Sequence, residues 1–388
     1  MEKMEENADY LTQQLITYIG NKRALLPFLK QAVDIVRKDI KKDKLKCADV
    51  FSGSGIVARY LKQFCSLLVV NDLEKYSCII NRCYLANGVG QNRRLKSTWQ
   101  ELTSKIDAKM EQLQHARING SYENPGFVSE LYAPAELKKI KRTDRCFYTP
   151  YNANYIDVAR QLIESEVPQE FRDFFIAPLL SQASVHANTA GIFKGFYKNS
   201  KTKTGQFGGN GKDALSRILG NISIPFPVYS NFDCESVVFN YNANDLVKLK
   251  EFKALGSFDM VYLDPPYNQH PYGSNYFMLN LIADYRRPDE QNISRVSGIP
   301  KDWNRSHYNK KRFAALDFFE LIEQLDSRYI LVSFNSEGFI SKDQMIDRLS
   351  KIGKLEVLET DYNTFRGSRN LNGREIHVKE YLFLVRKH

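Results

Sequence analysis

The chain has 388 residues, 43% of them hydrophobic, and a formal net charge of +10. A chain of this length has enough apolar residues for a substantial core and exceeds the usual size of one compact unit, so we expect two domains or one domain with a large insertion. The excess of positive charge favours a polyanionic partner such as nucleic acid, because a positive surface attracts phosphate groups.

The cysteines, the histidines and the N-terminal composition exclude several classes of protein. The six cysteines form no CxxC pair and the six histidines are scattered, which predicts a reduced, cytosolic protein without a zinc or other metal site. The first ten residues, MEKMEENADY, are acidic and polar rather than cationic and then apolar, and no apolar run reaches the roughly 20 residues that span a bilayer. We therefore expect a cytoplasmic protein that does not enter a membrane.

Strand and helix signals alternate in residues 1–90. Residues 46–51 form a short apolar run that stops at a glycine-rich turn, and residues 56–61 continue as a helix. Residues 67–70 form a second run that ends close to Asp72, and residues 76–86 again have a helical pattern. Alternation of this kind is typical of an α/β protein with a mostly parallel sheet.

The middle of the chain, residues 91–230, lacks this alternation. It contains mixed helical pieces and, at residues 191–212, a run rich in glycine, lysine and asparagine. We interpret it as an inserted domain that separates residues 1–90 from residues 231–388, because turn-forming residues are concentrated there and no internal repeat is detectable.

Strand signals resume after the insertion, at residues 236–240, 258–263, 329–334, 355–359 and 379–385. An amphipathic helix at residues 313–326 precedes the third of these runs. The last two runs flank a polar loop without a helix, so they should pair antiparallel. The sequence predicts an α/β fold whose seven-stranded sheet is mostly parallel, with the last strand reversed.

The turn after the first strand has the pattern G-x-G-x-x-A, in which Gly53 and Gly55 precede the helix. Glycines are needed where the chain turns tightly and a ligand approaches the backbone, and an acid at the end of the second strand, Asp72, suits ribose hydroxyls. The pattern predicts a nucleoside-binding turn. Nicotinamide cofactors and S-adenosylmethionine both contain adenosine, so both remain open at this point, as does a purely structural turn.

The strand at residues 258–263 is followed directly by Asp264-Pro265-Pro266-Tyr267. Two consecutive prolines cannot continue a strand, so they fix a rigid kink at the carboxyl end of the sheet, where open α/β sheets bind ligands. The kink holds a carboxylate, the Pro265 carbonyl and an aromatic ring in register. An exocyclic nucleobase amine requires that set: two acceptors for its two hydrogens and a π-face for the base. The segment predicts a catalytic centre acting on such an amine, the alternative being a strand end with structural prolines.

Four motifs follow one another in a characteristic order. They are residues 18–22 (YIGNK), residues 49–55 (DVFSGSG), the acid Asp72 and the tetrapeptide at residues 264–267. In this order they resemble the Dam-like class of adenine-N6 DNA methyltransferases, most closely the branch that protects the short asymmetric sites of type IIS restriction systems. The resemblance implies a Rossmann-like S-adenosylmethionine methyltransferase fold with target recognition in the insertion. It also implies that S-adenosylmethionine is bound by Tyr18, Gly20, Lys22, Asp49, Phe51, Gly53, Gly55, Asp72 and Asp245.

Basic and aromatic residues alternate within the insertion, and a second basic loop joins the last two strands. Lysines neutralise phosphates, and aromatic rings stack where a base has left the helix. His186, Asn188 and Thr189 are either base or phosphate contacts or satisfied core residues, and residues 268–276 are expected to close over the base. We predict DNA contacts by Lys194, Tyr197, Lys198, Lys201, Lys203, Arg366 and Arg369, the alternative being a solvated surface.

These features together predict a site-specific enzyme that transfers a methyl group from S-adenosylmethionine to the N6 amino group of a flipped-out adenine in double-stranded DNA, within a restriction-modification system. We expect a monomer whose cognate restriction endonuclease acts separately. The alternatives are the same chemistry on cytosine N4, RNA or a protein glutamine amide, a nicotinamide-dependent oxidoreductase, and a non-catalytic DNA-binding protein. Aspartate at the first position of the tetrapeptide favours adenine, and either Asp264 or water accepts the released proton.

Overall fold

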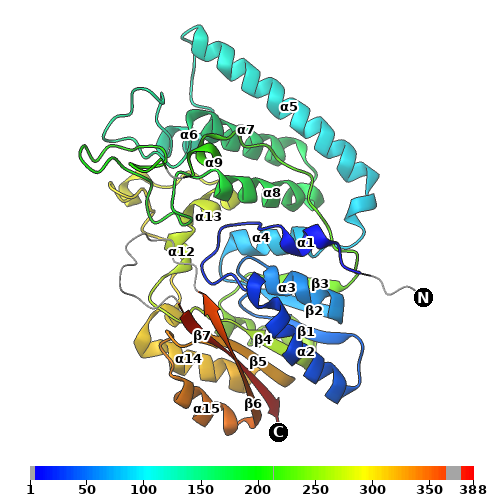
Figure 1. The fold of residues 1–388 in the computed structure, drawn as a ribbon. Helices are drawn as coiled ribbons and strands as arrows, with labels where there is room; N and C mark the ends of the chain where they lie inside the picture. Colours follow the sequence, from blue (N-terminus) through cyan, green and yellow to red (C-terminus); the bar gives the residue numbers. More distant parts are fainter. Residues whose placement is uncertain (1–4, 213, 364–376) are drawn as a thin grey trace.

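The centre of the protein is one seven-stranded sheet, seen in a computed structural model that describes residues 5–212, 214–363 and 377–388 (Figure 1). The strand order is β3-β2-β1-β4-β5-β7-β6. The first five strands run parallel to one another, whereas β7 is antiparallel to both of its neighbours. The predicted number of strands and the reversed last strand are confirmed. The strands are β1 (Leu45–Asp49), β2 (Cys65–Asn71), β3 (Glu235–Phe239), β4 (Phe258–Leu263), β5 (Ser327–Asn335), β6 (Gly353–Asn363) and β7 (His377–Lys387).

The strand order reverses in the middle of the sheet. Strand β1 pairs with β2 on one side and with β4 on the other, so the chain leaves this point in two directions. Open α/β sheets bind ligands at such a reversal, outside the carboxyl ends of the strands, because the loops on either side diverge and leave a crevice. The predicted glycine turn follows β1 and the predicted tetrapeptide follows β4. The topology therefore brings both motifs to one crevice.

Helices cover both faces of the sheet. Successive side chains of a strand point to opposite faces, so in β4 Met260 and Tyr262 belong to one apolar layer while Val261 and Leu263 belong to the other. Burial on both faces explains why the strands are continuous apolar runs in the sequence. One layer contains α2 (Leu26–Ile40) and α3 (Ile56–Leu61), and the other contains α10 (Ala243–Leu246), α11 (Lys250–Ala254), α14 (Lys311–Gln324) and α15 (Lys342–Ser350).

A mostly helical region stands above the sheet in Figure 1. It shares one apolar core with helices from both flanking parts of the chain, α4 (Lys75–Tyr84) and α13 (Phe277–Asp284), which contact α8 (Arg172–Val185). The division into residues 1–90, 91–230 and 231–388 therefore stays a prediction, since the helical region does not pack separately from its neighbours. Its helices are α5 (Arg93–Ile118), α6 (Phe127–Leu131), α7 (Pro150–Glu166), α8 (Arg172–Val185) and α9 (Leu215–Leu219), and the short helices α1 (Ala8–Thr12) and α12 (Tyr272–Asn275) lie nearby.

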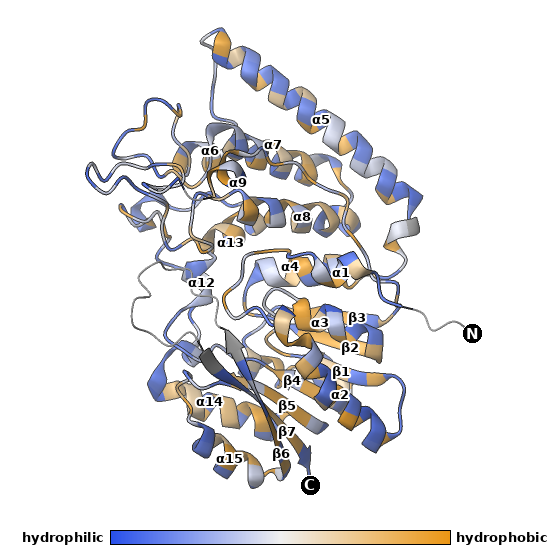
Figure 2. Cartoon of the chain, viewed as in Figure 1, coloured by the Kyte–Doolittle hydropathy of each residue, from blue (hydrophilic) through white to orange (hydrophobic). Residues whose placement is uncertain are grey.

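Helix α5 is the longest helix of the described residues and the least buried. Figure 2 shows hydrophobic colour concentrated on the strands, whereas hydrophobic and hydrophilic residues are mixed along α5. Its buried side chains, Leu95, Leu102, Ile106 and Met110, are spaced as one stripe, and the helix packs against α7. Across the described ranges, none of the helices combines the length and the apolar character that crossing a bilayer requires.

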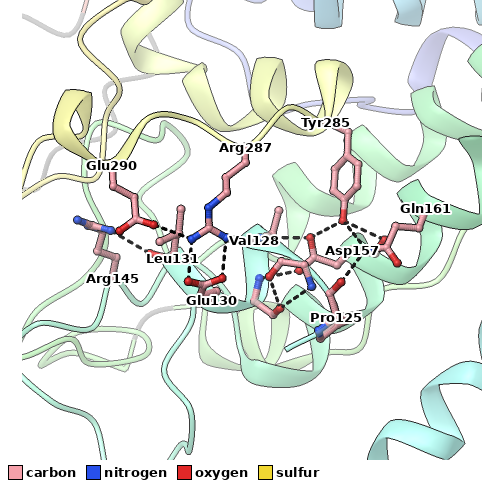
Figure 3. A network of polar contacts seen from close by, with 12 residues as sticks. Pro125, Val128, Glu130, Leu131, Arg145, Asp157, Gln161, Tyr285, Arg287 and Glu290 are labelled. Atoms are coloured by element: carbon pink, nitrogen blue, oxygen red, sulfur yellow. Dashed lines mark hydrogen bonds and ion pairs between the residues drawn. The ribbon is translucent and has the colours of Figure 1, made fainter. Parts of the chain in front are cut away.

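A polar network ties the helical region to the chain that follows α13 (Figure 3). Asp157 of α7 accepts a hydrogen bond of 2.7 Å from the backbone N–H of Ser129 and one of 2.8 Å from the hydroxyl of Tyr285. Arg287 donates to both carboxylate oxygens of Glu130 at 2.7 Å, the bidentate geometry that a guanidinium favours. Because α13 follows the tetrapeptide, this network fixes the helical region relative to the crevice.

Candidate active site

The crevice at the carboxyl edge of the sheet is a cavity of about 920 Å³, counted with its open mouth. Its wall is formed by residues 18–22, by the turns that follow β1, β2 and β4, and by residues 304–309. Segments far apart in the sequence therefore meet around one space. The predicted residues that line it are Tyr18, Gly20, Lys22, Asp49, Phe51, Gly53, Asp72, Asp264, Pro265, Pro266 and Tyr267.

The glycine turn needs glycine at both predicted positions. Gly53 and Gly55 have φ angles of +53° and +75°, a region that other residues rarely adopt. A Cβ atom on Gly53 would lie 2.7 Å from the ring of Tyr18, and one on Gly55 would lie 2.7 Å from the amide oxygen of Asn81. Asp72 fixes the turn from the next strand, since its carboxylate accepts a hydrogen bond of 2.7 Å from the backbone N–H of Gly53. Gly55 thus shapes the turn, although it does not line the cavity.

The tetrapeptide places a carboxylate next to a buried lysine. Oδ1 of Asp264 lies 3.3 Å from Nζ of Lys22, and that ammonium also lies 3.4 Å from Oε2 of Glu380 on β7. The ring of Tyr267 has its centroid 5.7 Å from the same ammonium and packs edge-to-face on Phe334. The arrangement fixes the Asp264 carboxylate and the Tyr267 ring on one side of the cavity.

Burial changes the proton affinity of these groups. Burial raises the pKa of Asp264 to about 6, with Lys22 opposing the shift and Glu380 adding to it. Burial alone would lower the pKa of Lys22, but the negative charges of Asp264 and Glu380 raise it well above its ordinary value. Lys22 is therefore a permanent cation at neutral pH, whereas Asp264 is largely ionised above about pH 6.

The segment after the tetrapeptide holds the N-terminal motif by its backbone. The hydroxyl of Tyr272 donates to the carbonyl of Ile19 at 3.1 Å, and the N–H of Ile19 donates to the hydroxyl of Tyr276 at 2.8 Å. The ring of Tyr18 lies 5.1 Å from the rings of both tyrosines. Tyr18 therefore stands between the glycine turn and the segment that follows the tetrapeptide, and the predicted closure of that segment over a base stays a prediction.

The cavity is lined by more negative than positive groups. Among the described residues that line it, the carboxylates are those of Asp49, Asp72, Glu74 and Asp264, and the only ammonium or guanidinium is that of Lys22. Burial raises the pKa of Asp72 to about 6 and that of Glu74 to about 7. Since Lys22 already faces two carboxylates, the described wall of the cavity offers no further cation to a polyanionic ligand.

Like Gly55, the predicted cofactor-binding residue Asp245 is not part of the cavity wall. It is exposed on α10, and the residues lining the cavity at that point are Tyr241, Asn242 and Ala243. The predicted motif therefore follows a loop that lines the cavity, but the residues that line it are those before Asp245. The side chain of Asn242 accepts from the N–H of Asn244, which begins the helix and turns Asp245 outward.

Several site residues were missed from the sequence. Glu74, Asn304 and Tyr308 line the cavity, and Glu380 contacts Lys22 from behind it. Glu74 is two residues beyond Asp72 and accepts a hydrogen bond of 3.1 Å from the side chain of Asn304. For Glu380 the sequence contained one signal, since it is an acidic residue at the start of the otherwise apolar run of the last strand.

The predicted basic segment begins beside α12, whose first residues, Tyr272 and Gly273, line the cavity. The N–H of Phe193 donates to the carbonyl of Asn275 at 2.7 Å, and Phe193 is buried in the helical core. Beyond it the chain forms a short hairpin, in which Lys198 is paired with Gly205. Lys194, Lys201 and Lys203 are exposed, whereas Tyr197 and Lys198 are half-buried. Arg366 and Arg369, the other predicted DNA contacts, lie outside the described residues.

The polar residues before this hairpin are satisfied by the protein itself. Asn188 is fully buried, and its amide donates to the carbonyl of Cys146 at 2.8 Å and accepts from the N–H of Gly208 at 3.0 Å. His186 contacts the carbonyl of Arg217 through Nδ1 at 2.6 Å. For Asn188 the structure supports the alternative of a satisfied core residue, because its side chain has no surface to offer to a base, whereas His186 is half-buried.

Comparison with known proteins identifies the family. The family model of the D12 class N6 adenine-specific DNA methyltransferases matches residues 18–347. Type II methyltransferase M.NlaIII of Neisseria lactamica is 29% identical over 379 residues, covering 96% of this chain and 99% of that protein. M.CviAII of Paramecium bursaria Chlorella virus 1 is 29% identical over 375 residues, covering 95% and 98%. M.FokI of Planomicrobium okeanokoites is 26% identical over 381 residues, covering 95% of this chain and 52% of that protein. These matches confirm the predicted resemblance, and the chain belongs to the D12 class of N6 adenine-specific DNA methyltransferases.

Proposed function

We propose that the enzyme takes its methyl group from S-adenosylmethionine and transfers it to the N6 amine of an adenine flipped out of double-stranded DNA at a specific sequence, with the amine held by Asp264 and the Pro265 carbonyl. The observation that carries the proposal is that the glycine turn and the tetrapeptide line the same cavity. A nucleoside bound at the turn and a base bound at the tetrapeptide would therefore meet in one space.

The tetrapeptide supplies what the amine needs. The nitrogen lone pair of adenine N6 is delocalised into the ring, so the amine is a poor nucleophile and its reaction depends on positioning and on stabilising the positive charge that develops. Asp264 and the Pro265 carbonyl would accept its two hydrogens and provide that negative potential, and the Tyr267 ring would stack on the base. The proton leaves to Asp264 or to water.

The charges around the cavity favour S-adenosylmethionine over a nicotinamide dinucleotide. When bound, S-adenosylmethionine supplies an electrophilic methyl group on a sulfonium cation. The pyrophosphate of a dinucleotide would meet Asp72 and Glu74 beside the glycine turn, without a cation of the cavity to balance it. Tyr18, Phe51, Gly53 and Asp72 would hold the adenosine and the methionine part, as the family resemblance implies.

The cofactor proposal makes a direct binding prediction. In a calorimetric titration we expect the protein to bind S-adenosylmethionine in the micromolar range, roughly 8 kcal/mol of binding free energy, and to show no heat with nicotinamide dinucleotides. Incubation with labelled S-adenosylmethionine and duplex DNA should then give labelled N6-methyladenine by mass spectrometry of the nucleosides. Label in N4-methylcytosine, in RNA or in protein glutamine would contradict the proposed substrate and support one of the alternatives.

We propose that the basic hairpin, residues 194–205, contacts the DNA backbone beside the cavity. The side chain of Lys198 donates to the carbonyl of Val296 at 3.4 Å, so the hairpin lies against the segment that leads into the cavity wall at residues 304–309. Exposed lysines at this place would attract phosphates near the target base. The relatives named type II methyltransferases support a role in restriction-modification. We propose in addition that the enzyme is a cytoplasmic monomer and that a cognate endonuclease acts separately.

Replacing Lys194, Lys201 and Lys203 by glutamine is expected to weaken DNA binding and its dependence on salt. Each phosphate contact contributes about one unit to the slope of log affinity against log salt, so the slope should fall by about two to three units while affinity for S-adenosylmethionine is unchanged. Fluorescence anisotropy at several salt concentrations measures the slope. Glutamine at Lys248, Lys250 and Lys253, which are equally exposed but lie at or next to α11 before β4, is the matched control. An equal loss in both triple variants would contradict a specific contact.

A further inference from the structure

We infer that Glu380 is a positioning residue for methyl transfer: its carboxylate neutralises Lys22, so that Lys22 holds Asp264 in place without cancelling the negative charge that Asp264 presents to the target amine. The inference rests on the proposed role of Asp264. Glu380 belongs to none of the motifs of the sequence, and it lies 358 residues from Lys22 in the chain.

The contact geometry places one buried cation between two carboxylates. Nζ of Lys22 lies 3.3 Å from Oδ1 of Asp264 and 3.4 Å from Oε2 of Glu380. The side chains of Lys22 and Glu380 are each 4% exposed, whereas the side chain of Asp264 is 18% exposed. Asp264 is therefore the most exposed of the three; Lys22 also lines the cavity, whereas Glu380 does not and lies behind the lysine.

The reversed strand explains how Glu380 reaches this place. Strand β7 runs antiparallel to β5, so the beginning of β7 lies beside the end of β5, at the carboxyl edge where the cavity opens. Glu380 is paired with Asn335, the last residue of β5. A parallel strand at the same position would bring the end of its sequence to this edge and could not place an early residue here.

The balance of charge gives Glu380 its effect. A buried lysine paired with Asp264 alone would form a closed neutral pair, in which the carboxylate is directed at the ammonium and less negative potential reaches the amine. With Glu380 present and Asp264 ionised, the three groups carry one net negative charge, because the single charge of Lys22 is shared between two carboxylates at nearly equal distances. As the amine nitrogen becomes positive during transfer, that excess stabilises it.

The ionisable surroundings of Asp264 set the pH dependence. Lys22 faces it from the N-terminal segment and Glu380 from β7. Among the described residues, the other ionisable neighbours are Asp49 of β1 and the phenols of Tyr262, Tyr267 and Tyr272. Burial raises the pKa of Asp264 to about 6, Lys22 lowers it and Glu380 raises it. Protonation removes the charge that holds the amine, so the rate of transfer should fall as pH decreases through about 6.

The test is the single-turnover rate of Glu380→Gln across a pH range. We expect the plateau rate to fall about 10- to 100-fold, with affinities for DNA and S-adenosylmethionine changed less than about three-fold. Loss of the Glu380 charge makes Asp264 easier to ionise, so the acid limb of the profile should move to lower pH by roughly one unit. Glu380→Asp should recover most of the rate. Glu359→Gln is the control, since Glu359 pairs with Lys342 and Lys379 but is exposed on β6.

The double variant Lys22→Met with Glu380→Gln separates charge balance from structure. If Glu380 acts by neutralising Lys22, the double variant should lose less than the product of the two single losses, because no unbalanced cation remains. An unchanged rate and acid limb in Glu380→Gln, or a reduced rate with an unmoved acid limb and a lower melting temperature, would overturn the inference. An active Asp264→Asn enzyme would instead overturn the proposed function on which it rests.

Discussion

Replacing Asp264 by asparagine is expected to reduce the single-turnover rate of methyl transfer by about 10³-fold or more, with affinities for DNA and S-adenosylmethionine changed less than about ten-fold. Asparagine has the same shape, but it carries no charge and its NH₂ group would face the hydrogens of the amine. The side chain of Asp264 is 18% exposed, and Lys22 keeps Glu380 as a partner, so the fold should tolerate the change. Rapid quenching with labelled methyl donor measures the rate.

Asp259→Asn is the matched control for this prediction. Asp259 belongs to the same strand, β4, but lies near its other end, where its carboxylate accepts a hydrogen bond of 2.9 Å from the N–H of Lys46. Asparagine can accept the same bond, so activity should stay within about two-fold of the wild type. If Asp264→Asn methylates adenine as fast as this control, the amine is held by other groups and the proposed function is wrong.

The second large effect is expected at the glycine turn, where Gly53→Ala should weaken binding of S-adenosylmethionine by about 10- to 100-fold. The new Cβ would lie 2.7 Å from the ring of Tyr18, which would have to leave its place beside Tyr272 and Tyr276. Overpacking of this kind costs about 1–3 kcal/mol, which corresponds to that loss of affinity if it falls on the binding-competent conformation. Calorimetric titration measures it.

Gly88→Ala is the control that separates the backbone strain of a glycine-to-alanine substitution from the steric contact with Tyr18. Gly88 has a φ of +63°, close to the +53° of Gly53, but a Cβ there would have no neighbour within 4 Å. Both variants should lose about 1 kcal/mol of unfolding free energy or somewhat more from the left-handed backbone, measured by urea denaturation. The loss of methyl-donor affinity should appear in Gly53→Ala alone, and an equal loss in Gly88→Ala would argue against the contact with Tyr18.

The strands were predictable wherever local chemistry marks both ends. Residues 258–263 were predicted without error, because Gly256 precedes the apolar run and Asp264-Pro265 ends it. The last two strands were predicted as residues 355–359 and 379–385, yet they extend to Gly353–Asn363 and His377–Lys387. Their ends are polar and owe their extension to pairing with each other, which no local pattern records.

The site was predictable in its contiguous parts only. Pro265 and Pro266 restrict the backbone locally, and Gly53 and Gly55 indicate a tight turn. Both motifs can therefore be recognised from the sequence without knowledge of the rest of the fold. Glu380 acquires its role from the register of β7 against β5, and Asn304 from a hydrogen bond to Glu74. The cofactor role of Asp245 stays a prediction, because the loop before it lines the cavity and only the side-chain cap of Asn242 separates that loop from Asp245.

The contact of Tyr272 and Tyr276 with the backbone of Ile19 bears on how variants of this enzyme are to be interpreted. Those tyrosines follow the tetrapeptide, while Ile19 stands between Tyr18 and Gly20 in the wall of the cavity. The proposed donor side and the proposed base side of the cavity therefore share one scaffold, and we expect a perturbation of either to affect the other. A change in methyl-donor affinity caused by a substitution in residues 268–276 does not assign that residue to the donor. Only a structure or a chemical cross-link distinguishes contact from transmission in this enzyme.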